Sequence, residues 1–177
     1  MTNKLLIVSG GQSGVDRAAL DIALGLGIPY AGWCPRGGWA EDFPVPPGVL
    51  ANYPQLRETP LADPAQRTEW NVRDSDAVLI LLDRGGLAAS RGTALARDLA
   101  ARHGNPVLVV GLDEPEALPR TAQWLDEVLA QRTPGAPLKL GIGGPRESEA
   151  AGIYTAAADF LRDLLQPRAP SSHVAQK

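Results

Sequence analysis

The chain has 177 residues, of which 44% are hydrophobic and 21% are charged, and its formal net charge is −3. These values are typical of a globular protein with one domain and a sizeable core, and the acidic balance argues against nucleic acid or a membrane as a partner. No apolar segment is long enough to act as a signal or to cross a bilayer, so we expect a cytoplasmic protein.

The first third of the chain opens with a strand and a helix. Residues 5–8 form an apolar run typical of a buried strand, and helical spacing of apolar residues predicts a helix over 15–26, ended by Gly27. A short second strand is expected over 28–32. Residues 33–63 are rich in Pro, Gly and Trp without a sustained period, so we expect a long loop that is functional or mobile.

The rest of the chain alternates helices with strands. Asp63 and Pro64 are a typical cap and first-turn residue of a helix. The segment from residue 166 to 177 shows no periodicity, so we expect a disordered tail after a single domain over 1–165. The pattern predicts helices over 64–75, 93–102, 119–131 and 153–164, and strands over 77–82, 106–110 and 138–142.

Strands that alternate with helices imply right-handed crossovers between parallel strands. The sequence therefore predicts an α/β fold of three layers, in which a mainly parallel, Rossmann-like sheet has helices on both faces. Ligands bind such sheets outside the carboxyl ends of the strands, where the glycine loops at 9–14 and 143–148 would lie. A loop that leads from a strand into a helix presents free N–H groups to an anion. We therefore predict a site for a phosphate-bearing small molecule.

The loop at 9–14 combines glycines with small polar side chains. Glycine lets the backbone pass close to a ligand, and Ser13 can cap the following helix or donate to a phosphate. The loop matches neither the dinucleotide fingerprint nor the P-loop, and the alternative is a plain tight turn. The binding residues expected here are Gly10, Gly11, Gln12, Ser13 and Gly14.

Asp16 lies in the first turn of the first helix, where the helix dipole stabilises a carboxylate. We include Asp16 among the binding residues, and expect it to contact a ribose, a heterocycle or a neighbouring loop. The alternative is a purely stabilising role.

Residues 33–42 place two tryptophans around Arg36 and end in the paired acids Glu41 and Asp42. Indole and guanidinium planes suit stacking on a flat heterocycle, and an arginine suits pairing with a phosphate. Arg36 is therefore a candidate binding residue. In the alternative, both tryptophans pack on the core and Arg36 pairs with Glu41 or Asp42.

Two later loops complete the candidate site. The loop at 90–93 opens a helix after a strand, so its amides and the Thr93 hydroxyl are placed to bind an oxyanion, with an ordinary helix cap as the alternative. The loop at 143–148 carries an arginine and a serine that a simple turn does not need, which favours function. The binding residues expected from these loops are Ser90, Gly92, Thr93, Gly144, Arg146 and Ser148.

No metal site is expected. Cys34 is the single cysteine, which excludes an internal disulfide and a cysteine-cluster site, and it is either a soft metal ligand or inert packing. His103 lies near a helix end and His173 lies in the tail, so a histidine site finds little support.

Five ordered blocks together resemble the family of molybdenum cofactor carrier proteins, over residues 4 to about 165. The wider superfamily of these proteins includes LOG-type nucleotide hydrolases and DNA-processing protein A, which share a Rossmann-like sheet with glycine loops at its ligand edge. The blocks are SGGQSGVDRAALD at 9–21, GWCPRG at 32–37, AED at 40–42, RTEWNVRDSDA at 67–77, and GPRES at 144–148 with GIY at 152–154.

The resemblance implies a homodimer or homotetramer that binds molybdenum cofactor, a phosphate-bearing pterin with a metal dithiolene, and delivers it to molybdoenzymes without turnover. The alternative that it implies is a nucleotide N-glycosidase of the LOG type, which uses a Pro-Gly-Gly-x-Gly-Thr-x-x-Glu loop. Here Ala96 stands at the glutamate position after Gly92-Thr93, and Asp98 lies too far along. We therefore rank the hydrolase second and a DNA-binding module last.

Overall fold

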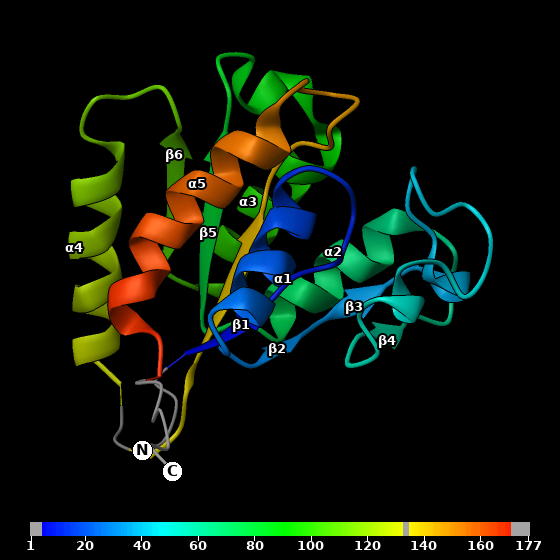
Figure 1. The fold of residues 1–177 in the computed structure, drawn as a ribbon, viewed down its shortest axis with the longest axis horizontal. Coiled ribbons are helices and arrows are strands. Elements are labelled where there is room, and N and C mark those ends of the chain that lie inside the picture. The colour runs from blue at the N-terminus through cyan, green and yellow to red at the C-terminus, as the bar shows by residue number, and fades with distance from the viewer. Residues whose placement is uncertain (1–4, 133–134, 171–177) are drawn as a thin grey trace, which may run out of the picture.

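The computed structural model describes residues 5–132 and 135–170 and contains a five-stranded parallel sheet in the order β2-β1-β7-β5-β6 (Figure 1). All four neighbouring pairs of strands are parallel, which confirms the predicted sheet. The strands are β1 (Leu5–Val8), β2 (Tyr30–Ala31), β5 (Ala77–Leu82), β6 (Val107–Gly111) and β7 (Leu138–Gly143).

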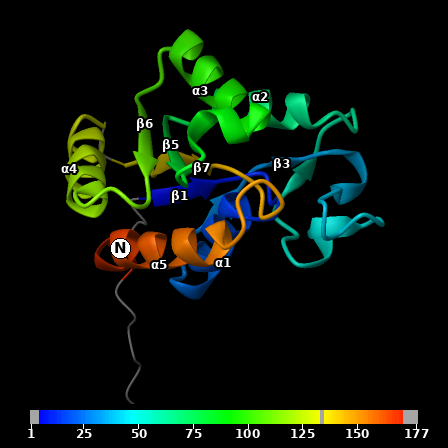
Figure 2. The same ribbon diagram turned by 90° about the horizontal axis from the view of Figure 1, so that it is seen from above.

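Helices cover both faces of the sheet, as the alternating pattern predicted (Figure 2). One face carries α2 (Pro64–Arg73) and α3 (Arg91–His103), and the other carries α1 (Val15–Gly25), α4 (Ala117–Ala130) and α5 (Ile153–Leu165). The pleat of β5 explains this. Val78, Ile80 and Leu82 pack with α2 and α3, whereas Leu79 and Leu81 belong to the core cluster on the opposite face.

The ends of two helices follow local chemistry. Asp63 caps α2, because its side chain accepts a hydrogen bond of 2.9 Å from the Ala65 amide, and Pro64 occupies the first turn. Ser90 caps α3, which therefore begins at Arg91, two residues before the predicted start. Gly104 ends α3 in the left-handed conformation with φ 71°.

The segment between β2 and α2 is more ordered than its sequence predicted. It contains a two-stranded parallel sheet of β3 (Trp33–Cys34) and β4 (Arg57–Glu58), and two short 3₁₀ helices, η1 (Arg36–Gly38) and η2 (Gly48–Ala51). These elements lie at the side of α2 (Figure 1). The Trp33 ring packs edge-on against the Trp70 ring of α2, with 4.7 Å between centroids. Residues 33–63 are therefore packed next to α2, and we call them the cover segment.

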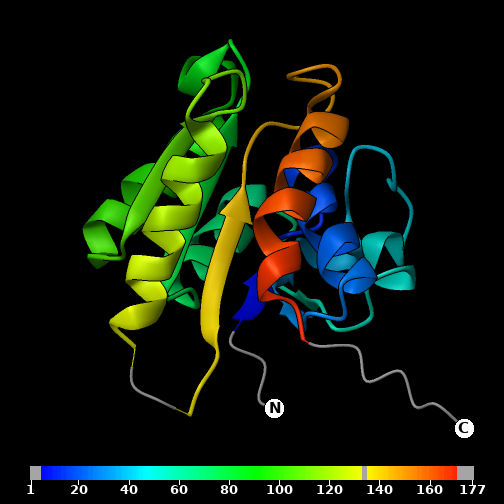
Figure 3. The ribbon, with the colours of Figure 1, turned by 60° about the vertical axis from the view of Figure 1, so that its left-hand side comes forward.

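At the C-terminal end, α5 lies beside α1 and continues into a further 3₁₀ helix, η4 (Gln166–Arg168) (Figure 3). Regular structure therefore extends beyond the predicted start of the tail at Gln166, because Arg168 pairs with Asp126 of α4 at 2.8 Å, a contact that periodicity does not reveal. Residues 171–177, with the rest of the predicted tail and His173, lie outside the described residues. None of the helices in the described part of the chain combines the length and the apolar character needed to span a bilayer.

Candidate functional site

A cavity of about 400 Å³ lies between the sheet and the helices α2 and α3, beside the carboxyl ends of β1 and β7. Its volume falls within the range of roughly 300–1,000 Å³ that is usual for small-molecule sites. The loop after β1, the helix α2, the start of α3 and the end of β7 all contribute to its wall. Its apolar lining includes Val72, Val78, Ile80, Leu95, Ala96 and Ile142.

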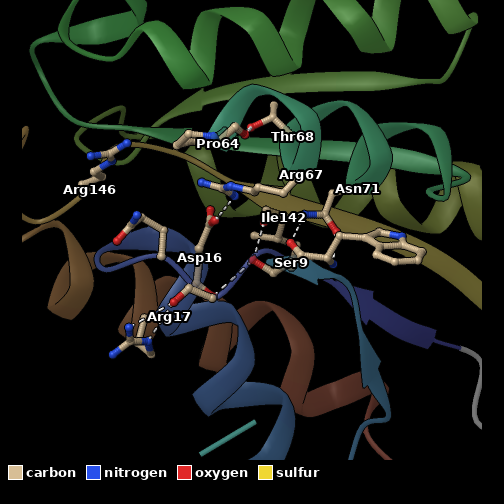
Figure 4. Close-up of polar contacts among 12 residues, drawn as sticks. Ser9, Asp16, Arg17, Pro64, Arg67, Thr68, Asn71, Ile142 and Arg146 are labelled. Atoms are coloured by element: carbon tan, nitrogen blue, oxygen red, sulfur yellow. Dashed lines mark hydrogen bonds and ion pairs between the residues drawn. The ribbon is translucent and has the colours of Figure 1, made fainter. Parts of the chain in front are cut away.

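An ion pair crosses the cavity wall between α1 and α2. Arg67 Nη1 lies 2.6 Å from Asp16 Oδ2, and the two side chains are only 14% and 7% exposed. Figure 4 shows Asp16 pointing toward Arg67 of α2, whereas Arg17 of the same turn points away. Because an isolated buried carboxylate is costly, Arg67 is the group that makes an acidic side chain tolerable here.

Ser9 fixes the turn that carries this pair. Its hydroxyl lies within hydrogen-bond distance of two main-chain carbonyl oxygens, 3.2 Å from that of Asp16 and 3.0 Å from that of Ile142 (Figure 4). The first turn of α1 is thereby tied to the end of β7, and both of these segments line the cavity.

The start of α3 forms another part of the wall. Ser90 and Thr93 are buried, and Ser90 Oγ accepts hydrogen bonds from the Thr93 amide at 3.3 Å and from the Thr93 hydroxyl at 2.9 Å. The Thr93 hydroxyl proton is therefore used within the helix cap, while the hydroxyl proton of Ser90 remains able to donate to a ligand. The amides of Arg91 and Gly92 have no acceptor within the helix, because they belong to its first turn.

Arg146 and Gly144 complete the wall after β7. The guanidinium of Arg146 lies 5.6 Å from the centroid of the Trp39 ring, which comes from the cover segment. The Arg146 amide donates to Glu149 at 2.9 Å. Gly144 must lack a side chain, because a Cβ there would meet the Leu81 carbonyl oxygen and would lie 2.6 Å from a methyl carbon of Val15.

The cavity brings together the predicted loops at 9–14, 90–93 and 143–148, and leaves the candidate segment 33–42 outside. The predicted residues that line it are Gly10, Gln12, Asp16, Ser90, Gly92, Thr93, Gly144 and Arg146. Those that do not line it are Gly11, Ser13, Gly14, Arg36 and Ser148.

The first loop explains two of these absences. Gly11 has φ 70°, and a Cβ there would lie 3.0 Å from a methyl carbon of Leu56, so this glycine serves the turn and its packing. Gly14 also has a positive φ, of 76°, and a Cβ there would meet the carbonyl oxygen of Pro145. Both glycines are therefore needed for folding.

Arg36 is exposed in η1, on the cover segment. The pairing of Arg36 with Glu41 or Asp42, which was the alternative prediction, is not formed. Asp42 pairs with Arg17 at 2.9 Å, and Glu41 binds two serines instead.

Glu41 accepts hydrogen bonds from Ser13 and Ser148, the two serines that were predicted to bind the ligand. Its carboxylate accepts hydrogen bonds from the hydroxyls of Ser13 and Ser148 and from the Ser148 amide, and its own amide donates to Gln12 at 2.9 Å. Burial opposes ionisation of Glu41, but these hydrogen bonds and the nearby Arg146 outweigh it and lower the pKa of the carboxyl. Glu41 thus ties the cover segment to both glycine loops.

Sequence reasoning missed the polar face of α2. This helix places a row of polar side chains on the cavity wall, and Asn71 also accepts from the Trp33 amide at 2.8 Å and so holds β3 in place. The signal was present, since positions 67, 68 and 71 recur at helical spacing. The missed residues are Arg67, Thr68 and Asn71 of α2, Ser75 shortly after the end of this helix, and Ser9 from the first loop.

Cys34 is fully buried and its thiol lies 3.4 Å from the Arg57 carbonyl oxygen. Burial, followed by the charge of Glu58, raises the pKa of the thiol to about 11, so it is a packing group rather than a reactive thiolate. Over residues 5–132 and 135–170, no three side chains among His, Cys, Asp and Glu gather in a cluster able to hold a metal ion.

Comparisons with known proteins agree with this architecture. The chain is similar to the Putative molybdenum carrier protein from Syntrophus aciditrophicus SB, whose crystal structure gives a TM-score of 0.76 at 37% identity and covers 92% of this chain and 96% of that chain. No curated protein matches. The family model described as the circularly permutated YpsA SLOG family matches residues 7–165. This protein therefore belongs to the circularly permutated YpsA SLOG family, in agreement with the resemblance found in its sequence blocks.

Proposed function

We propose that this protein binds a phosphate-bearing heterocyclic small molecule, and that it acts as a carrier or store of molybdenum cofactor. The observation that carries the proposal is the meeting, in one cavity, of the start of α3 with Arg67 and Arg146. These groups come from distant parts of the chain, and each of them suits negative charge.

The start of α3 suits the phosphate. The amides of Arg91 and Gly92 and the positive end of the helix dipole favour an anion, and Ser90 keeps a hydroxyl proton to donate. The cavity lining contains three arginines (Arg67, Arg91, Arg146) and two carboxylates, so its charge is positive in a protein of net charge −3.

The remainder of the cavity suits a flat ring system. Aliphatic side chains of β5 and α3 offer apolar surface to the faces of a ring, and the polar groups of Gln12, Asp16 and Arg67 are available to its edge. A pterin that carries a phosphate fits this division into an apolar part and an anionic part. The description of the Syntrophus relative as a molybdenum carrier supports the choice of molybdenum cofactor among such ligands.

A nucleotide N-glycosidase is the second candidate, and the observation in its favour is the carboxylate of Asp16 in the cavity. In that reaction water adds to the anomeric carbon of the ribose, the glycosidic bond breaks, and the base leaves with a proton. The cavity wall carries Ala96 at the position of the catalytic glutamate of the LOG motif, and this favours binding without turnover.

Native mass spectrometry of protein purified without oxygen from cells that make the cofactor tests the carrier function. We expect an adduct with the mass of the phosphorylated pterin, molybdenum in the same sample, and the mass of the homo-oligomer. Arg146→Ala should lose the adduct, while Arg84→Ala, which removes an exposed arginine that pairs with Asp113 outside the cavity lining, should keep it. Wild-type protein that carries neither pterin nor molybdenum would contradict the proposal.

Incubation with AMP or GMP tests the second candidate. Unchanged nucleotide in the mass spectrum supports the carrier. Release of free base and ribose 5-phosphate would establish the hydrolase instead.

A further inference from the structure

We infer that Asp16 sets the ligand specificity of the cavity by accepting hydrogen bonds from an amino group and a ring N–H of the ligand. The site would then select a 2-amino-4-oxo ring of the kind found in pterins and in guanine. This inference rests on the proposed function, because it concerns the heterocyclic end of the same ligand.

One oxygen of Asp16 is unused. Oδ2 binds Arg67 at 2.6 Å, whereas Oδ1 accepts no hydrogen bond from any residue of the described ranges. The side chain is 7% exposed and lines the cavity, so what remains accessible faces the ligand space. The Oδ1 atom is accessible from the cavity rather than fully enclosed, and an N–H group of a bound ligand would give it a donor.

The charge of Asp16 decides which part of the ligand it meets. A carboxylate only accepts hydrogen bonds and repels a phosphate, so the anionic end of the ligand belongs at the start of α3. Asp16 is left with the uncharged end, and that end must present hydrogen-bond donors.

Arg67 narrows the choice further. Its guanidinium keeps donors that are not used by Asp16, so a free acceptor and free donors lie side by side on the cavity wall. A 2-amino-4-oxo ring has the complementary edge, in which an amino group and a ring N–H lie next to a carbonyl oxygen. Adenine lacks the second donor and the carbonyl, and therefore satisfies fewer of these groups.

The test compares GMP with IMP, which differ only in the 2-amino group, by calorimetric titration. We expect wild-type protein to bind GMP at least about tenfold more tightly, because IMP leaves the carboxylate short of one donor. Asp16→Asn keeps the size of the side chain but replaces an acceptor by an amide that also donates. In that variant we expect the affinity for GMP to fall to that for IMP.

Asp42→Asn is the matched control, since it removes a carboxylate that is paired with Arg17 and lies outside the cavity lining. It should leave the ratio of the two affinities unchanged. If the wild type binds GMP and IMP with equal affinity, or binds neither, the inference is overturned. Equal affinity is the result expected if Asp16 instead binds the ribose, which both nucleotides share.

A preference that persists in Asp16→Asn, or an equal loss of affinity for both nucleotides, would also overturn it, since the second result identifies Asp16 as merely the partner of Arg67. Guanosine separates this question from the proposed function. Guanosine lacks the phosphate of GMP, so weaker binding of guanosine than of GMP measures the contribution of the phosphate to the affinity. This comparison tests the proposed function independently of the result for Asp16.

Discussion

Gly10→Ala is the substitution that tests the geometry of the cavity wall most sharply. Gly10 has an ordinary backbone conformation, so an alanine is sterically allowed by the backbone itself. Its Cβ, however, would lie 2.9 Å from Cζ and 3.1 Å from Cδ of Arg67, inside normal contact distance. The guanidinium must move aside, and we expect this movement to break the 2.6 Å pair with Asp16.

The size of the effect follows from the burial of that pair. Removing one partner of a buried ion pair costs about 3–5 kcal/mol, whereas a compatible Gly-to-Ala change returns about 0.4–1 kcal/mol through the unfolded chain. We therefore expect a net loss of about 2–4 kcal/mol in the free energy of unfolding. For a chain of 177 residues, at about 2–4 °C per kcal/mol, the Tm should fall by about 4–16 °C.

Thermal unfolding followed by circular dichroism is the assay. Gly25→Ala is the matched control, because Gly25 ends α1 with nothing within 4 Å of its added Cβ. Its Tm should equal or exceed that of the wild type. If Gly10→Ala unfolds at the wild-type temperature, Arg67 does not lie across this glycine in solution, and the account of the cavity wall is wrong.

Four further predictions concern the site and its surroundings. Gly92→Ala should keep the wild-type Tm, because nothing lies within 4 Å of the added Cβ. Calorimetry should show weaker binding of inorganic pyrophosphate, because the methyl group obstructs the start of α3. Undiminished affinity would show that the start of α3 is not part of the site. Arg146→Ala should lose roughly tenfold or more in affinity for the same anion with little change in Tm, and unchanged affinity would deny it a role. Because the pKa of Glu41 is lowered on folding, its ionised carboxylate stabilises the protein fully above the ordinary pKa of 4.5, and this stabilisation is lost as the pH falls through the folded-state pKa. The Tm of the wild type should therefore drop more steeply on acidification than the Tm of Glu41→Gln. Parallel curves of Tm against pH would refute this. Cys34, with its thiol pKa raised to about 11, should resist iodoacetamide at neutral pH until the protein is denatured, and rapid alkylation of the native protein, read by mass spectrometry, would contradict its burial.

Most elements of the fold could be predicted from the sequence because their signals are local. The run Ala77–Leu82 is apolar throughout, and β5 is buried on both faces as such a run predicts. The cover segment could not be predicted in the same way. Its strands have two residues each and exist only because Trp33 pairs with Arg57, far along the chain.

Only part of the candidate site, too, could be predicted from the sequence. The loops at 9–14, 90–93 and 143–148 could be expected to meet, because the carboxyl ends of parallel strands share one edge of the sheet. Arg67 was missed because it lies inside a helix, where polar residues at helical spacing are also typical of a face exposed to solvent. Ser13 and Ser148 were assigned to the ligand because sequence does not reveal that Glu41, a residue of the cover segment, binds both of them.

The central claim is that one cavity collects the start of α3 and the loops after β1 and β7 to bind negative charge. Titration of ¹⁵N-labelled protein with inorganic pyrophosphate, followed through amide chemical shifts, tests this claim most directly. We predict that the amides of Gly10, Gly92 and Gly144 shift together and saturate with a single dissociation constant. Shifts confined to other parts of the chain, or different constants for these three glycines, would contradict the claim.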